Sequence, residues 1–163
     1  MVKKSLLFFL PVSLSFAQPA ALANCDCPSL QDIAGEYITT EIARYRGGLT
    51  SPEQAERRIG VSTRVTEHAF SLWNEVYYEA PSYEVVCHSQ RQEEGEVAAP
   101  SERWGYFYGF GVDRNTIVTL DIVPSEQDGA RLSFEFVDDE LWAFIDGWFY
   151  RLEREPKVED DET

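Results

Sequence analysis

An alternation of apolar and polar residues dominates the last third of the chain. Its apolar positions form two groups separated by a turn at 125–129: Val118, Leu120 and Ile122, then Leu132, Phe134 and Phe136. A period of two residues is typical of a β-strand with one buried face and one face in water. The pattern therefore predicts two strands, one on each side of the turn.

A further pair of strands surrounds Asp146-Gly147, the strongest two-residue hairpin signal in the chain. Such a turn fixes the register of the strands that it joins. On one face the opposite pairs are Ile145 with Trp148, Ala143 with Tyr150 and Leu141 with Leu152, and on the other face Phe144 with Phe149 and Trp142 with Arg151. Both faces are partly apolar, so we expect one face to line the core and the other to pack under a helix or a loop.

Residues 35–46 are rich in β-branched and aromatic types, which favours a long strand, and the imperfect alternation predicts a bulge in it. Residues 51–60 start with Ser51 and Pro52 and end with Gly60, which is the pattern of a short, capped helix.

Two more strands are expected at 61–66 and 70–72, around a turn near Glu67-His68. Another strand follows Pro81, with Tyr83, Val85 and Cys87 on its inward face. Residues 90–101 are expected to form a loop. Together the elements predict a mostly β domain, a single antiparallel barrel of about eight strands with one short helix after the first strand. A β-sandwich is the alternative.

The N-terminus has the order of a secretory signal: Lys3 and Lys4, an apolar run, and then Ala21-Leu22-Ala23. Cleavage after Ala23 predicts a signal peptide at 1–23, a β-barrel domain at 24–154 and an acidic, disordered tail at 155–163. The mature chain then carries 12 basic and 29 acidic residues, a formal charge of −17. This charge disfavours nucleic acid and anionic membranes as partners. The signal itself predicts a periplasmic or secreted protein, and the apolar run, interrupted by Pro11 and Ser13, is too short for a transmembrane span.

The three cysteines are Cys25, Cys27 and Cys87. In an oxidising compartment we expect Cys87 to form a disulfide with Cys27 or, alternatively, with Cys25, which would clamp the N-terminal segment onto the sheet. Leu22-Ala23-Asn24-Cys25 also resembles a lipoprotein box, in which case Cys25 carries a lipid anchor and Cys27 pairs with Cys87. No metal site is expected, because the chain has neither a Cys-x-x-Cys nor a His-x-x-x-His motif.

The segment 104–111 alternates aromatic residues with glycines and is expected to form a strand. The aromatic residues expected on one face, as a ligand-binding wall for an apolar or sugar ring, are Trp104, Tyr106, Tyr108 and Phe110. The alternative interpretation is a barrel strand whose glycines permit sharp coiling.

Catalytic residues are not predicted. The only histidines, His68 and His88, are expected at an exposed turn and on the outward face of a strand. The chain holds 29 acidic residues, so a pair of carboxylates at a suitable separation has no meaning by itself. The acidic run Asp138-Asp139-Glu140 lacks the spacing of a calcium loop and is expected to be a turn between strands.

The motifs Gly35-Glu36-Tyr37, 50–55 with Ile59-Gly60, Pro81-Ser82-Tyr83 and 146–150 resemble those of small secreted bacterial proteins of the lipocalin-like barrel type. The chain is also similar in size and compartment to periplasmic lysozyme inhibitors, and 128–132 holds a fragment of their loop motif. The signal peptide and the lack of a catalytic constellation lead us to expect an exported, non-enzymatic protein without a cofactor. A small apolar or glycan-like ligand is the first candidate for what it binds, and a basic protein, such as a secreted enzyme that it inhibits, is the alternative.

Overall fold

The structure is a computed structural model, and it describes residues 27–89, 97–126 and 129–156. The domain is mostly β, as predicted, and nine antiparallel strands form one sheet in the order β4-β3-β2-β1-β9-β8-β7-β6-β5. The strands are β1 (Gly35–Arg44), β2 (Ser62–Val65), β3 (Ala69–Leu72), β4 (Val76–Glu79), β5 (Ser82–Ser89), β6 (Thr116–Val123), β7 (Leu132–Val137), β8 (Glu140–Ile145) and β9 (Trp148–Arg154).

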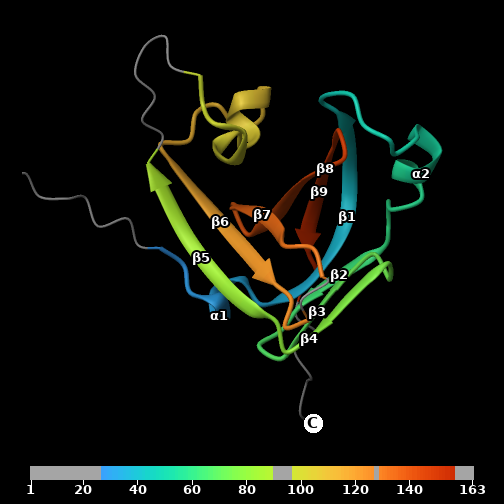
Figure 1. The fold of residues 1–163 in the computed structure, drawn as a ribbon, viewed down its shortest axis with the longest axis vertical. Coiled ribbons are helices and arrows are strands. Elements are labelled where there is room, and N and C mark those ends of the chain that lie inside the picture. The colour runs from blue at the N-terminus through green and yellow to red at the C-terminus, as the bar shows by residue number, and fades with distance from the viewer. Residues whose placement is uncertain (1–26, 90–96, 127–128, 157–163) are drawn as a thin grey trace, which may run out of the picture.

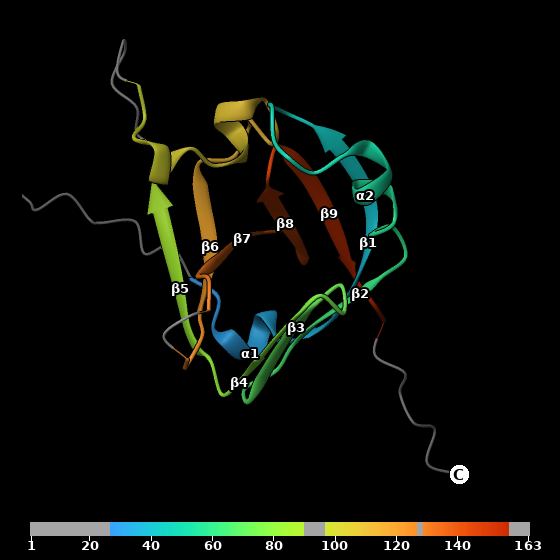
Figure 2. The same cartoon turned by 45° about the vertical axis from the view of Figure 1, so that its right-hand side comes forward.

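The sheet curls strongly, so that β5 and β6 approach the β2–β4 region from the other side (Figures 1 and 2). The sheet is not closed by hydrogen bonds between strands, because β4 and β5 remain its two edges. The edges are joined by the short connection Ala80-Pro81, and the Tyr83 hydroxyl donates to the Ala69 carbonyl at 2.9 Å. The predicted barrel of about eight strands is therefore a curled half-barrel sheet of nine.

Several local predictions are confirmed. β1 contains a register shift between Thr39 and Glu41, which is the expected bulge. The short helix α2 (Pro52–Glu56) begins with a capping box in which the Ser51 and Gln54 side chains each bind the other residue's backbone N–H. The β8–β9 hairpin has the predicted register throughout, from Ile145 opposite Trp148 to Leu141 opposite Leu152.

Other elements differ from the prediction. The helix α1 (Leu30–Ile33) was not expected, although Ser29 and Asp32 form a capping box at its start. The segment 104–111 is not a strand: the 3₁₀ helices η1 (Pro100–Glu102) and η2 (Gly105–Tyr108) occupy this region. Gly109 ends η2 with a φ of 88°, a left-handed conformation that a strand does not contain.

One face of the sheet carries the hydrophobic core, and α1 packs on it through Ile33 (Figure 2). The largest fully buried side chains are those of Tyr37, Tyr150, Phe70 and Phe134. The Tyr37 hydroxyl donates to the Ile33 carbonyl. Burial raises the pKa of this hydroxyl to about 12, and the positive charge of Arg154 offsets only part of the rise. The core is thus filled by aromatic and aliphatic side chains, and it holds α1 in place.

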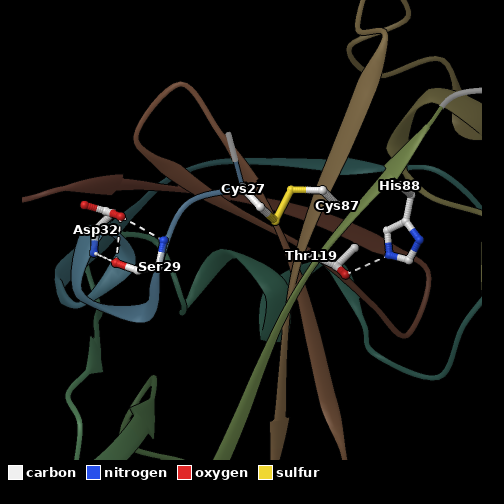
Figure 3. Close-up of a disulfide and its surroundings, with 6 residues drawn as sticks. All are labelled: Cys27, Ser29, Asp32, Cys87, His88 and Thr119. Atoms are coloured by element: carbon white, nitrogen blue, oxygen red, sulfur yellow. Dashed lines mark hydrogen bonds between the residues drawn. A yellow bond between two sulfur atoms is a disulfide. The ribbon is translucent and has the colours of Figure 1, made fainter. Parts of the chain in front are cut away.

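A disulfide joins Cys27, just before α1, to Cys87 on β5 (Figure 3). It selects between the two predicted partners of Cys87 and ties α1 to the edge of the sheet. The expected signal peptide, Cys25 and tail residues 157–163 lie outside the described residues. Within the described part of the chain, no helix has the length and apolar character needed to span a membrane.

Candidate ligand site on the second sheet face

The face of the sheet opposite the core, called the second face below, is covered at one end by the segment 97–115. Its covered side chains include Glu135 on β7, Phe144 on β8 and Phe149 on β9. This confirms the expectation that the second apolar face of the β8–β9 hairpin packs under a loop. The loop is the aromatic segment itself.

A buried carboxylate, that of Glu135, fastens this segment to the sheet. Glu135 is 3% exposed and accepts a hydrogen bond from the backbone N–H of Gly105 at the start of η2. Its other oxygen forms an ion pair with Arg114, with an Nη2–Oε2 distance of 2.7 Å. One side chain therefore holds both ends of the aromatic segment.

The Arg114 side chain is supported by an aromatic ring as well as by a carboxylate. Its Cζ lies 5.0 Å from the centre of the Trp142 ring. Its Nη1 is buried and forms no hydrogen bond with the described residues. The ring face of Trp142 offers this cation an electrostatic partner where no oxygen is present.

The four residues of the predicted aromatic wall have different surroundings. Tyr108 lies against Tyr45, with ring centres 4.5 Å apart, and Phe110 stacks on Phe149 at 4.4 Å. Both rings contribute to packing between the segment and the sheet. Trp104 and Tyr106, with ring centres 6.3 Å apart, lie nearer the start of the segment, and Trp104 lines a cleft.

This cleft has a volume of about 150 Å³ and lies between the start of η2 and strands β7 and β8. The side chains that line it include Ser101, Arg103, Trp104, Ser133, Glu135 and Phe144. Trp104 and Phe144 provide apolar walls, and the serines and the arginine provide polar groups. Such a combination of aromatic surface and a few polar groups is typical of small-molecule sites.

The indole N–H of Trp104 differs in its hydrogen bonding from those of the other tryptophans in the domain. Three of the four tryptophans donate their indole N–H within the protein: Trp73 to Thr39, Trp142 to Glu140 and Trp148 to the Thr50 carbonyl. Among the described residues, the Trp104 indole N–H has no acceptor, and the Ser101 and Ser133 hydroxyls form no hydrogen bond. These donors are available to a ligand.

Arg103 adds a cation to the cleft. Its Nε donates to the Ala98 carbonyl at 3.1 Å, and its Cζ lies 5.0 Å from the centre of the Phe107 ring. In the part of the chain that the structure describes, it forms no ion-pair contact with a carboxylate. Its terminal nitrogens can therefore donate to an oxygen of a bound molecule.

His88 supports Trp104 from the sheet. The two ring centres are 4.3 Å apart, and the His88 Nε2 lies 3.1 Å from the Thr119 hydroxyl. Cys87 and His88 project from opposite sides of β5 (Figure 3), which confirms that His88 faces away from the core. His88 is half-buried under Trp104, whereas an exposed side chain was expected; His68 lies on an exposed turn, as expected.

In the acidic run, Asp138 and Asp139 form the turn between β7 and β8, and Glu140 is the first residue of β8. Two of the three carboxylates bind arginines. Asp139 pairs with Arg154 at 2.7 Å, and Glu140 accepts two hydrogen bonds of 2.7 Å from Arg151. Burial raises the pKa of Glu140, but the bonds from Arg151 and Trp142 outweigh burial and keep the pKa below its usual value. Within the described residues, no group of three or more His, Cys, Asp or Glu side chains is placed to hold a metal ion.

The sequence pattern indicates Trp104 but not the residues that form a cleft beside it. Glu135 lies between Phe134 and Phe136 and has the pattern of a solvent-facing strand position, so the sequence carries no signal of its burial. Ser101, which was expected in a loop, and Ser133, on a polar strand position, likewise carry no signal of the cleft. Only the charged residue Arg103, which precedes Trp104 in the sequence, indicates a polar group beside this ring.

Comparisons of the chain with family models, with curated proteins and with solved structures find no match. Its function must therefore be argued from the residues and their geometry.

Proposed function

We propose that this chain is an exported, non-enzymatic binding protein that holds a small, sugar-like ring in the cleft beside Trp104. The observation that carries the proposal is the set of unused hydrogen-bond donors around one aromatic ring. The Trp104 indole N–H, two serine hydroxyls and Arg103 border the same cleft. Elsewhere in the domain, tryptophan and most arginine nitrogens already have partners within the protein.

The chemistry of the cleft favours a sugar over a purely apolar molecule. A sugar ring has apolar C–H surfaces that pack on aromatic rings and hydroxyls that accept hydrogen bonds at its edge. Trp104 and Phe144 supply the first contact, and the serines and Arg103 supply the second. An apolar ligand would leave these donors desolvated and unpaired, which costs binding free energy.

The size of the cleft limits the ligand to about one ring. Its volume of about 150 Å³ is below the range of roughly 300–1,000 Å³ that is usual for pockets of drug-sized molecules. On the core face, the rings of Tyr37, Tyr150 and Phe134 are themselves fully buried and pack into the core. We therefore place the ligand on the second face, under the aromatic segment, and not inside the curl of the sheet.

Titration calorimetry of the mature protein with glucose, N-acetylglucosamine and glucuronate tests the proposal. We expect weak binding of at least one sugar, with a Kd of about 1 mM, which corresponds to about −4.1 kcal/mol. Trp104→Ala should abolish the binding. Tyr77→Ala is the matched control, because Tyr77 is an exposed aromatic residue on β4 away from the cleft. Binding that is absent for all three sugars, or unchanged in Trp104→Ala, contradicts the proposal.

The binding of a basic protein is the second candidate, and the surface charge favours it. The chain has no lysine between Lys4 and Lys157, and many of its arginines are paired with carboxylates of the same domain. The remaining acidic groups leave a strongly negative surface that attracts cations at low salt. Salt-dependent retention of a basic secreted enzyme, with loss of that enzyme's activity, would favour this candidate.

The relation to lipocalin-like secreted proteins and the periplasmic or secreted location belong to the same proposal. The curled antiparallel sheet with a helix after β1 agrees with such a fold. The Cys27–Cys87 disulfide agrees with an oxidising compartment, because disulfides are rare in reducing ones.

A further inference from the structure

The loop 47–50, between β1 and α2, presents an apolar side chain to solvent at its tip. Leu49 is 96% exposed, more than any other large apolar residue among those described. A single exposed leucine on a protein surface is ordinary and needs no explanation. The structure of the loop that carries it is what makes Leu49 unusual.

The Asp146 carboxylate, in the β8–β9 turn, accepts hydrogen bonds from this loop. One of its oxygens accepts the Leu49 N–H at 2.9 Å, and the other accepts the Thr50 N–H and, at 2.7 Å, the Thr50 hydroxyl. These bonds lower the pKa of Asp146 from its usual value of 3.8. A Cβ at Gly48 would overlap the Asp146 carbonyl oxygen, so the two segments are in direct backbone contact.

A second set of contacts holds the loop carbonyls. The Arg44 guanidinium donates to the carbonyls of Arg46, Gly48 and Thr50 at 3.0, 3.4 and 3.3 Å. The Trp148 indole N–H also donates to the Thr50 carbonyl at 3.0 Å, and the Arg44 Cζ lies 5.1 Å from the Trp148 ring centre. Both N–H and C=O groups of this loop are therefore fixed by residues of the sheet.

Such a loop loses little conformational entropy when a partner binds it, and this saving increases affinity. The Leu49 side chain itself adds nothing to the stability of the domain, because almost all of it is in water. A polar residue would serve the fold equally well at this position. An apolar side chain on a rigid support is, however, the arrangement of an interface anchor.

The charges beside the loop indicate which charged groups of a partner protein would surround Leu49. Most arginines of the described domain pair with carboxylates, but Arg46 and Arg57, on either side of the loop in sequence, form no ion-pair contact there. Arg46 donates to the Tyr45 hydroxyl through its Nε, and its other side-chain nitrogens form no hydrogen bond with the residues that the structure describes. Glu53 and Glu56 on α2 are the nearby acids in sequence, and the charge of Asp146 also acts on Arg46. A hydrogen bond from its own backbone N–H and one from Ser51 lower the pKa of Glu53, and the charge of Arg57 lowers it further.

We infer that the loop 47–50 is a preformed docking element that inserts Leu49 into an apolar pocket of a folded partner protein whose rim carries carboxylates for Arg46. A membrane surface fits these observations less well. One leucine offers little apolar area for insertion into lipid. A protein pocket requires only one well-placed anchor.

The experiment places a photoreactive leucine analogue at position 49 of the full-length protein, in the cells that normally express it. After irradiation, the crosslinked partner is identified and its crosslinked peptide is mapped. We expect one predominant protein, linked at an apolar pocket that has acidic residues at its rim. Crosslinks to lipid, to a second copy of this chain, to many unrelated proteins or to nothing would each overturn the inference.

Binding of the purified partner then provides the quantitative test. We expect Leu49→Ala to raise the Kd at least tenfold, and Arg46→Ala to raise it less. Asp146→Asn should also raise the Kd, although Leu49 is unchanged, because the support of the loop is weakened. Ile59→Ala is the control, since Ile59 is an exposed aliphatic residue outside the loop and should leave the Kd within twofold. A Kd that does not change in Leu49→Ala contradicts the inference.

This inference is independent of the sugar site, and the two can fail separately. Leu49 does not line the cleft beside Trp104, and Trp104 makes no contact that supports the loop. Leu49→Ala should therefore leave the sugar titration unchanged, and Trp104→Ala should leave the crosslink at position 49 intact.

Discussion

Gly105 occupies a position where backbone, carboxylate and aromatic ring meet. Its N–H donates to Glu135, and a Cβ added there would lie 2.8 Å from Phe144 Cζ and 3.3 Å from the nearer Glu135 oxygen. Phe144 cannot move away easily, because its ring packs against Tyr45 and Phe149. The absence of a side chain at 105 is therefore required by the contact between η2 and the sheet.

Gly105→Ala should lower the free energy of unfolding by about 1–3 kcal/mol, because the added methyl group overpacks this contact. Urea unfolding of the two proteins measures the difference. Gly47→Ala is a suitable control, since a Cβ at Gly47 meets no atom within 4 Å. Equal stability of Gly105→Ala and the unaltered protein would show that the segment is not packed against the sheet as described.

The Glu135 carboxylate stabilises the same contact between η2 and the sheet. Glu135→Ala removes the partner of the Gly105 N–H and of Arg114, and it should lower the unfolding free energy by about 1.5–3 kcal/mol. Glu84→Ala, on the exposed edge strand β5, should change it by less than about 0.5 kcal/mol. Hydrogen exchange should show faster exchange of the 97–115 amides in Glu135→Ala alone. If the two variants have the same unfolding free energy and the same exchange rates of the 97–115 amides, Glu135 does not hold the segment on the sheet.

At the scale of the elements, the sequence was informative where a short motif determines the local geometry. Asp146-Gly147 has φ values of 46° and 84°, the left-handed pair that a tight hairpin requires, and the register follows from it. Ser51, Pro52 and Gln54 likewise specify the start of α2. These signals involve residues that lie close together in the chain, so they can be interpreted without knowledge of the tertiary structure.

The aromatic segment was misinterpreted because its alternation imitates a strand. Gly109 and Gly111 adopt φ values of 88° and 59°, which turn the chain instead of extending it. The contacts that select this conformation come from Glu135 and Phe144, which are distant in sequence. The cleft arises from the same long-range packing, so only one of its residues, Trp104, was predicted.

The support of the loop 47–50 should depend on pH in a defined way. The pKa of Asp146 is lowered in the folded protein, so its bonds stabilise the loop above the usual pKa of 3.8 and are lost as the pH falls through the lower, folded value. The amide chemical shifts of Leu49 and Thr50 should therefore titrate with a midpoint below 3.8. A midpoint at or above this value would mean that the carboxylate does not hold these amides.

At the scale of the whole molecule, the disulfide connects the start of the described chain to an edge strand. Cys27 and Cys87 are separated by 60 residues, so the crosslink restricts a long loop of the unfolded chain. It also holds α1, and with it Ile33, on the core face. The edge strand β5 is thereby bound covalently, toward its C-terminal end, to the segment before α1.

Replacing both Cys27 and Cys87 with serine should lower the free energy of unfolding by about 2–4 kcal/mol, chiefly because the unfolded chain becomes less restricted. Cys25→Ser should leave the stability unchanged. A loss of stability in Cys25→Ser, with none in Cys27→Ser, would instead assign the bridge to Cys25.

The proposed function depends on Trp104 being the ring that meets a ligand, and indole NMR signals test this directly. The ¹⁵N-labelled protein has one indole N–H signal for each of its four tryptophans. On addition of N-acetylglucosamine or glucuronate, we predict that the Trp104 signal shifts and that the signal of Trp73, which is buried and bound to Thr39, does not. A Trp104 signal that stays in place while the sugars are raised well above millimolar concentration would contradict the proposed function.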